Sequence, residues 1–315
     1  MKILITGING FVGSNLVRFL KSKYDIYGLD IIDPVIEGVL YTYRWEQLNT
    51  NNIPDVDVII HLAGKAHDTL NHTEPQEYFD INSGLTKLIY DYYLQSSASK
   101  FIFFSSVKAA AYKLDNDCLT EDVIPNPIGP YGESKLKAEQ YIHDNLPVNK
   151  ENKYVYILRP CMIHGPGNKG NFNLLYNIVS KGIPWPLGSF QNRRTFTSID
   201  NICFIVESLL IQVIDSGVYN VGDDEALSTN ELIEIICRVI GKKTHIWKIN
   251  KRVVKSCATV GGWLHMPLNI ERLQKLTENY ISSNAKIKAA LGIEKMPIDA
   301  RMGFVRTIES FHHII

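Results

Sequence analysis

The chain of 315 residues has few cysteines, no excess of charge of either sign and no long apolar run. Its five cysteines are scattered without paired spacing, which argues against a disulfide framework or a metal site and favours reduced thiols. Basic and acidic residues both number 33, so no surplus of positive charge favours nucleic acid or a membrane surface. The first residues lack the apolar core of a secretory signal, and no stretch is long enough to span a bilayer. We therefore expect a cytoplasmic protein with no metal, nucleic-acid or membrane partner.

The first half of the chain alternates short apolar runs with amphipathic stretches. Buried strands are expected at residues 2–5, 25–30, 57–62, 100–106 and 154–158. Helices are expected at residues 11–20, 76–96 and 131–145. Because continuous apolar strands alternate with helices, the pattern predicts an α/β fold with a doubly wound parallel sheet covered on both faces. Ligands of such sheets bind at the carboxyl ends of the strands.

A glycine-rich segment follows the first expected strand and opens the first expected helix. Gly7, Gly10 and Gly13 are spaced G-x-x-G-x-x-G, which allows a tight turn and close approach of the backbone to a pyrophosphate. The start of the helix adds N–H groups and a partial positive charge. Asp30 ends the second expected strand, where a carboxylate binds a ribose diol and repels a 2′-phosphate. These residues predict a dinucleotide site that favours NAD over NADP.

Tyr131 and Lys135 lie four residues apart in an expected helix, and therefore on one face of it. An ammonium group beside a phenol favours the phenolate, so we expect Lys135 to lower the pKa of Tyr131 and make it a candidate acid/base. With 16 tyrosines in the chain, about one such pair is expected by chance. Ser106 ends the expected strand upstream, at the edge where ligands bind, and Arg159-Pro160 closes the next strand. The order of these motifs is more specific than any one of them.

In these motifs the chain resembles the extended short-chain dehydrogenase/reductase family, the NAD-dependent epimerases and dehydratases of nucleotide sugars. The resemblance implies that Tyr131 is the catalytic base for a sugar hydroxyl, that Ser106 bonds to the same oxygen, and that Lys135 binds the nicotinamide ribose. It implies that the cofactor is contacted by Gly7, Gly10, Phe11, Val12, Gly13, Asp30, Leu62, Ala63, Gly64, Asn82, Ser105, Tyr131, Lys135 and Pro160.

The resemblance also implies a UDP-sugar substrate, contacted by Ser106, Tyr131, Asn171 and Arg194. The guanidinium of Arg194 suits the nucleotide diphosphate, because its planar fork matches phosphate oxygens. Met162 stands where many relatives carry a substrate-contacting asparagine. The resemblance further implies a homodimer built from the helices at residues 76–96 and 131–145.

The pattern changes after Pro160, where a glycine-rich segment follows. We expect a Rossmann domain over residues 1–164 and a smaller mixed α/β domain that binds the nucleotide sugar over residues 165–315, with segments near 194–222 returning to the first domain. Helices are expected near residues 172–181, 200–213, 228–240 and 284–291, and a strand at residues 217–222. Ser228 and Glu231 have the spacing of a capping box.

Several reactions are compatible with this site. Dehydration across C4–C6 needs a second acid/base pair, and relatives with that activity carry Asp-Glu directly after the serine, where this chain has Val107-Lys108. Two hypotheses remain. One is a 4-epimerase, which acts through a transient 4-keto sugar on UDP-hexose or UDP-N-acetylhexosamine. The other is an NAD(P)H-dependent 4-ketoreductase. The segments after Ser106 and after Pro160 are similar to members that make precursors of cell-surface polysaccharides, and we favour the epimerase.

A third hypothesis is that the protein is a non-catalytic regulator that binds a dinucleotide. The presence of Ser106, Tyr131 and Lys135 argues against it, because a regulator has no need of an acid/base group. His61 ends an expected strand, and a packed role is favoured over a catalytic one.

Overall fold

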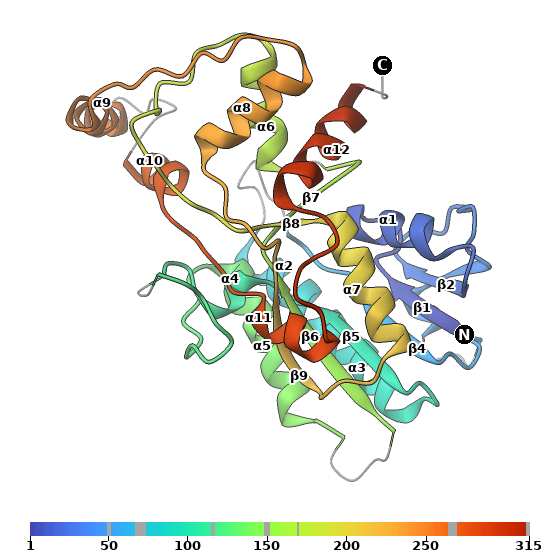
Figure 1. Cartoon of the computed structure of the whole chain (residues 1–315). Coiled ribbons are helices and arrows are strands. Elements are labelled where there is room, and N and C mark those ends of the chain that lie inside the picture. The colour runs from blue at the N-terminus through green and yellow to red at the C-terminus, as the bar shows by residue number, and fades with distance from the viewer. Residues whose placement is uncertain are drawn as a thin grey trace.

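The computed structural model describes residues 1–48, 52–66, 74–114, 117–147, 152–168, 170–263 and 270–312. Its largest feature is a sheet of seven strands in the order β3-β2-β1-β4-β5-β6-β9, all paired in parallel (Figure 1). The strands are β1 (Lys2–Thr6), β2 (Asp25–Asp30), β3 (Tyr41–Arg44), β4 (Val58–His61), β5 (Lys100–Phe104), β6 (Tyr154–Pro160) and β9 (Gly217–Val221). This confirms the predicted fold class. The short edge strand β3 was not expected.

The strand order reverses beside β1. The chain runs from β1 to β2 and β3 on one side, then crosses to β4 on the other side of β1. The carboxyl ends of β1 and β4 therefore border the point where doubly wound sheets bind their ligands. Gly7 follows β1 there, and Leu62 follows β4.

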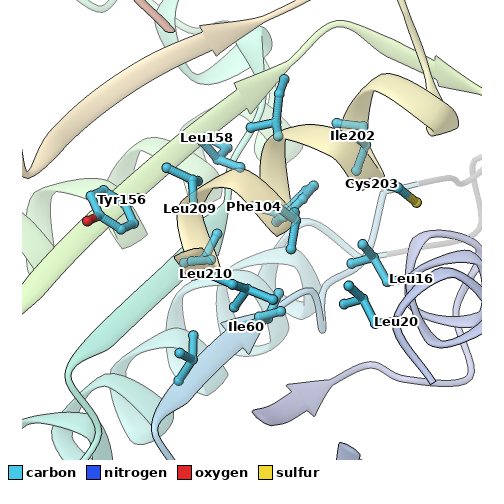
Figure 2. Packing of buried hydrophobic residues seen from close by; sticks show 14 of the residues in the cluster. Leu16, Leu20, Ile60, Phe104, Tyr156, Leu158, Ile202, Cys203, Leu209 and Leu210 are labelled. Carbon is cyan, nitrogen blue, oxygen red and sulfur yellow. The ribbon is translucent and has the colours of Figure 1, made fainter. Parts of the chain in front are cut away.

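Helices cover both faces of the sheet, because successive apolar residues of each strand point to opposite sides. On one face, α1 (Phe11–Leu20) and α7 (Ile199–Ile211) bury Leu16, Leu20 and Leu209 against Ile60 and Phe104 (Figure 2). On the other face, α3 (Leu85–Gln95) and α5 (Pro130–Asp144) pack with a second group of buried side chains. That group includes Leu4, Ile59, Ile89, Tyr90, Tyr93, Phe101, Phe103, Ala138 and Ile142.

The expected helix at residues 76–96 is one continuous helical segment in three parts. It begins as α2 (Pro75–Tyr78), passes through the π-helical turn η2 (Phe79–Gly84) and continues as α3. A π turn shifts the faces of the helix on its two sides, and such turns occur frequently at functional sites. Here the turn carries Asn82, which is fully buried.

Helices from the second half of the chain pack around a separate apolar cluster. It joins α6 (Asn171–Ser180), α8 (Thr229–Val239) and α12 (Ala300–His312), which Figure 1 shows grouped at one end of the sheet. Phe172, Ile236 and Phe304 are buried there. The expected capping box of α8 is confirmed, since the hydroxyl of Ser228 accepts the backbone N–H of Glu231. The division into two domains at residue 164 stays a prediction.

Several elements of the second half were not expected from the sequence. They are the two-stranded sheet of β7 (Met162–His164) and β8 (Phe196–Ser198), and the helices α9 (Lys251–Trp263), α10 (Ile270–Thr277) and α12. Each helix in the described part of the chain is too short or too polar to cross a membrane.

Candidate active site

The glycine-rich loop after β1 is packed backbone against backbone. Gly7 has a φ of +66°, and a Cβ placed on it would lie 2.8 Å from the backbone of Ala63. A Cβ on Gly13 would lie 2.5 Å from the carbonyl oxygen of Gly7 and 2.6 Å from that of Ile8. No side chain can occupy these positions without displacing the loop. The loop therefore brings bare backbone to the start of α1, which suits a pyrophosphate.

Replacing Gly13 by alanine is expected to weaken NAD binding by about ten- to hundredfold, because the clashing atoms belong to the backbone and the loop must move. Titration calorimetry with NAD measures the change. Gly217→Ala is the matched control, since its Cβ would meet only the Lys286 Nζ atom, at 3.9 Å. Equal affinities of NAD for wild type and Gly13→Ala would contradict a cofactor role for this loop.

Asp30 is held at the carboxyl end of β2 by two backbone N–H groups. Asn9 donates to its Oδ2 at 3.0 Å and Ile31 donates to its Oδ1 at 2.7 Å. A carboxylate accepts about four hydrogen bonds, so both oxygens keep lone pairs for a ribose diol. Because Asn9 lies in the glycine-rich loop, the same carboxylate ties the loop to β2. The arrangement fits the predicted preference for NAD.

The end of β4 meets the helix that carries the Tyr–Lys pair. The backbone N–H groups of Leu62 and Ala63 donate to the hydroxyl oxygen of Thr6 at 3.2 and 3.1 Å. A Cβ on Gly64 would lie 2.8 Å from the Asn82 Oδ1 atom and 3.0 Å from the Lys135 Nζ atom. The chain thus passes close to both side chains, and a larger residue at position 64 would have to displace the Asn82 amide.

Ser106 and Tyr131 lie together, as the sequence predicted. Ser106 precedes the short helix α4 (Val107–Ala110), and its hydroxyl accepts the backbone N–H of Lys108 at 3.2 Å. Burial raises the pKa of Tyr131, a hydrogen bond from the Ser106 side chain lowers it in part, and the nearby Tyr78 raises it further. The Ser106 side chain therefore lies close enough to act on the pKa of Tyr131. The Tyr78 ring lies 6.4 Å from the Tyr131 ring in an edge arrangement.

Lys135 does not lower the pKa of Tyr131 in this structure, and that expectation is wrong. Its ammonium is buried, donates to the carbonyl oxygen of Phe104 at 2.9 Å and lies 5.0 Å from the centre of the Phe103 ring. Burial lowers the pKa of Lys135 to about 8, and Glu139 partly opposes that shift. Spacing along a helix predicts that Tyr131 and Lys135 share a face, but burial has the largest effect on the pKa of each group.

The depressed pKa of Lys135 predicts a dependence of stability on pH. Unfolding restores an ordinary value near 10.5, so the unfolded chain binds more protons between about pH 8 and 10.5 and stability rises with pH there. The shift corresponds to roughly 3 kcal/mol. We expect Lys135→Met to gain stability relative to wild type at pH 7.5 and to lose this advantage by pH 10, as measured by urea unfolding. A stability difference that does not change with pH would contradict this result.

A buried ion pair holds the two strand ends next to this helix. Arg159 at the end of β6 donates to Glu139 of α5 through Nε at 2.9 Å and through a terminal nitrogen at 2.5 Å. The hydroxyl of Ser105 also donates to Glu139. Ser105 was predicted to contact the cofactor, and the structure places its side chain on this carboxylate. Glu139 lies one helical turn after Lys135, so the pair fixes the helix relative to β5 and β6.

The comparisons with known proteins agree with this geometry. The model of the NAD dependent epimerase/dehydratase family matches residues 3–222. The chain belongs to this family. The Vibrio cholerae protein named UDP-glucose 4-epimerase is 29% identical to it over 333 residues, which cover 98% of this chain and 95% of the relative. The Escherichia coli O157:H7 protein named N-acetyl-alpha-D-glucosaminyl-diphospho-ditrans,octacis-undecaprenol 4-epimerase is 26% identical over 246 residues, which cover 76% and 73% of the two chains.

A solved relative has the same fold. The crystal structure of UDP-glucuronic acid 4-epimerase from Bacillus cereus in complex with NAD matches with a TM-score of 0.75 at 22% identity, over 100% of this chain and 99% of that one. Membership of the epimerase/dehydratase family confirms the predicted resemblance and makes NAD the cofactor. The bare loop at Gly7 and the free lone pairs of Asp30 fit this cofactor.

The predicted cofactor residues of this family member gather at one edge of the sheet. The glycine-rich loop with Phe11 and Val12 follows β1, Asp30 ends β2, and residues 62–64 follow β4. Ser105 follows β5, and Pro160 ends β6. Lys135 and Asn82 border this edge from α5 and η2. The sequence therefore predicted a set of residues that the fold brings together, although their individual roles stay predictions.

Two of the predicted substrate residues, Asn171 and Arg194, lie in the second half of the chain. Arg194 forms isolated bridges with Leu227 and Tyr280, and its guanidinium lies 3.3 Å from the carboxylate of Glu278. The hydroxyl of Tyr280 donates to the carbonyl oxygens of Val107 at 3.1 Å and Ala111 at 2.7 Å. Tyr280 thus links the Arg194 segment to the α4 helix after Ser106. Asn171 begins α6, and its side chain lies outside the described part of the structure.

Sequence reasoning missed the polar residues that support this site. Glu139 had one available signal, which is its position four residues after Lys135 on the same helical face. Thr6, Thr86 and Ser134 had none, because the sequence does not show which hydroxyl groups are fully buried. Met162 lies on β7 with 36% of its surface exposed.

Proposed function

We propose that this protein is a UDP-sugar 4-epimerase that acts on a UDP-hexose or UDP-N-acetylhexosamine through a transient 4-keto sugar. The observation that carries the proposal is the proximity of Ser106 and Tyr131, at the sheet edge where the glycine-rich loop and Lys135 also lie. The similarity to the Vibrio cholerae relative over nearly the whole of both chains supports it. The α4 helix, with the sequence VKAA, offers no carboxylate for 4,6-dehydration.

Each residue at the site has a distinct task in this proposal. Ser106 holds the C4 hydroxyl of the sugar, and Tyr131 takes its proton and later returns it. Lys135 binds the nicotinamide ribose, while Asp30 holds the ribose diol at the adenine end of the cofactor. When bound, NAD would supply the hydride acceptor for oxidation at C4 and, once reduced, the hydride donor for the return step. Arg194 and Asn171 are proposed contacts of the UDP moiety, with Arg194 on the diphosphate.

An epimerase turns over without net consumption of NADH, whereas a reductase consumes NADH. We expect purified protein to retain NAD and to convert UDP-glucose or UDP-N-acetylglucosamine to its galacto isomer without added cofactor, as followed by NMR of the anomeric protons. Turnover of a 4-keto nucleotide sugar with consumption of NADH would identify the 4-ketoreductase instead. Cofactor binding without turnover of either class would indicate a regulator.

The role in cell-surface polysaccharide precursor synthesis is part of this proposal and rests on the resemblance of the segments after Ser106 and after Pro160. The homodimer built from α3 and α5 and the cytoplasmic location stay predictions. Sedimentation of the purified protein measures its oligomeric state.

A further inference from the structure

A series of buried polar side chains runs from the glycine-rich loop to the helix of Tyr131. It consists of Thr6, His61, Thr86, Asn82 and Ser134, each with an exposed fraction of 0%. They come from five different segments: β1, β4, α3, η2 and α5. Buried polar groups are costly unless they are hydrogen-bonded, so their mutual contacts are a requirement of the fold.

The contacts of His61 define where its proton lies. The hydroxyl of Thr86 donates to the carbonyl oxygen of Asn82 at 2.6 Å, so its only proton is already used. The Nε2 atom of His61 lies 2.9 Å from that hydroxyl oxygen and must therefore donate to it. Nδ1 is then the acceptor, and Thr6 donates to it at 2.6 Å. This arrangement requires a neutral imidazole with its proton on Nε2.

The two ends of the series reach the two halves of the site. The hydroxyl oxygen of Thr6 accepts the backbone N–H groups of Leu62 and Ala63, at the end of β4. At the other end, the amide of Asn82 donates to the Ser134 hydroxyl at 3.0 Å, and that hydroxyl donates to the carbonyl oxygen of Tyr131 at 2.9 Å. Because each hydroxyl both accepts and donates, the direction of every bond depends on its neighbours.

We propose that His61 is a positioning residue which, as a neutral imidazole protonated on Nε2, holds the NAD-contacting end of β4 on one side and the Tyr131 helix on the other. On the first side it acts through Thr6. On the second side it acts through Thr86 and Asn82. The proposal deepens the proposed function and rests on it for the role of Tyr131 and for the cofactor contacts of residues 62–64, whereas the use of NAD follows from family membership.

The surroundings of His61 favour the neutral ring. Phe103 stacks on it with ring centres 5.5 Å apart, and Phe101 and Trp45 lie at 6.2 and 6.4 Å. Lys135 is a charged group that interacts electrostatically with the ring. Burial lowers the pKa of His61 well below its ordinary value, and the positive charge of Lys135 lowers it further. No carboxylate among the described groups acts on the pKa of His61 in the opposite direction.

The protonation state can be read directly in the NAD-bound wild-type protein. We expect the ¹⁵N NMR spectrum of His61 to show a protonated Nε2 and an unprotonated Nδ1 that do not titrate from pH 5.5 to 8.5. An imidazolium, or a proton on Nδ1, would overturn the proposal without bearing on whether the protein is an epimerase.

Two substitutions separate the two sides of the ring. Both replacements are amides and differ in reach. The shorter asparagine places its amide near the position of Nδ1, where the oxygen accepts from Thr6 but no group reaches Thr86. The longer glutamine places its amide near the position of Nε2, where the NH₂ group donates to Thr86 but no group reaches Thr6. We expect His61→Gln to raise the Kd for NAD by about tenfold with kcat at saturating NAD nearly unchanged. We expect His61→Asn to lower kcat by about tenfold with the Kd for NAD nearly unchanged.

Controls distinguish positioning from support of the fold alone. His143→Gln should change neither quantity. Thr86→Val, which removes one hydroxyl at nearly constant volume, should repeat the kcat effect of His61→Asn. If both His61 variants lose thermal stability but keep wild-type NAD affinity and kcat, His61 is only structural and the proposal is wrong. If the protein proves to be a reductase, the same split between NAD affinity and kcat is expected for the reductase reaction.

Discussion

Replacing Tyr131 by phenylalanine is expected to lower kcat by about 10²- to 10⁴-fold, because the variant lacks the hydroxyl that exchanges a proton with the sugar. The ring and its edge contact with Tyr78 remain, so the fold and the affinity for NAD should be retained. Stopped assays with the active UDP-sugar measure kcat, and calorimetry measures NAD binding. The comparison isolates the chemical step from cofactor binding.

Tyr24→Phe is the matched control, since Tyr24 follows α1 and lies away from Ser106 in the sequence and the fold. It should keep wild-type turnover. A Tyr131→Phe variant that retains most of its kcat would contradict the assignment of Tyr131 as the acid/base. A variant that has lost NAD binding would show that Tyr131 supports the cofactor site rather than the proton transfer.

Replacing Glu139 by glutamine is expected to destabilise the protein by about 3–5 kcal/mol, because it leaves the buried guanidinium of Arg159 without its counter-charge. Urea unfolding at pH 7.5 measures this loss. Activity should fall as well, since Glu139 binds Ser105 and acts on Lys135 from the same helix.

Two further variants test the origin of that loss. The double variant Glu139→Leu/Arg159→Met should recover most of the stability, because a buried pair replaced by apolar groups leaves no unpaired charge. Glu207→Gln, which breaks the more exposed pair with Lys23, should change stability little. If Glu139→Gln unfolds at the same urea concentration as wild type, the pair does not anchor the ends of β5 and β6.

The parts of the fold that the sequence predicted carry strong local signals. The central strands are continuous apolar runs, and the loop at Gly7 combines three spaced glycines with a strand before it and a helix after it. The exposed edge strand β3 gives no such signal, because its pairing with β2 forms it. The helices α9, α10 and α12 were missed because each has only a short apolar face. The apolar residues of that face form a recognisable pattern only once their packing partners are known.

The same distinction applies to the site. The spacing of Tyr131 and Lys135 predicted a shared helical face, and the order of motifs predicted which side chains meet at the sheet edge. The direction of the Tyr131 pKa could not be predicted, because it depends on burial by segments distant in the sequence. The partner of Glu139 lies on β6, and the partners of His61 lie on β1 and α3, so neither contact has a sequence signature.

The central claim is that the hydride removed from C4 returns to the same sugar. It is tested most directly with the active UDP-sugar deuterated at C4, incubated with purified protein and an excess of unlabelled free NADH. The account predicts that the deuterium is retained at C4 of the galacto isomer, with no change in the amount of NADH. Loss of deuterium from C4, or net consumption of NADH, would contradict it.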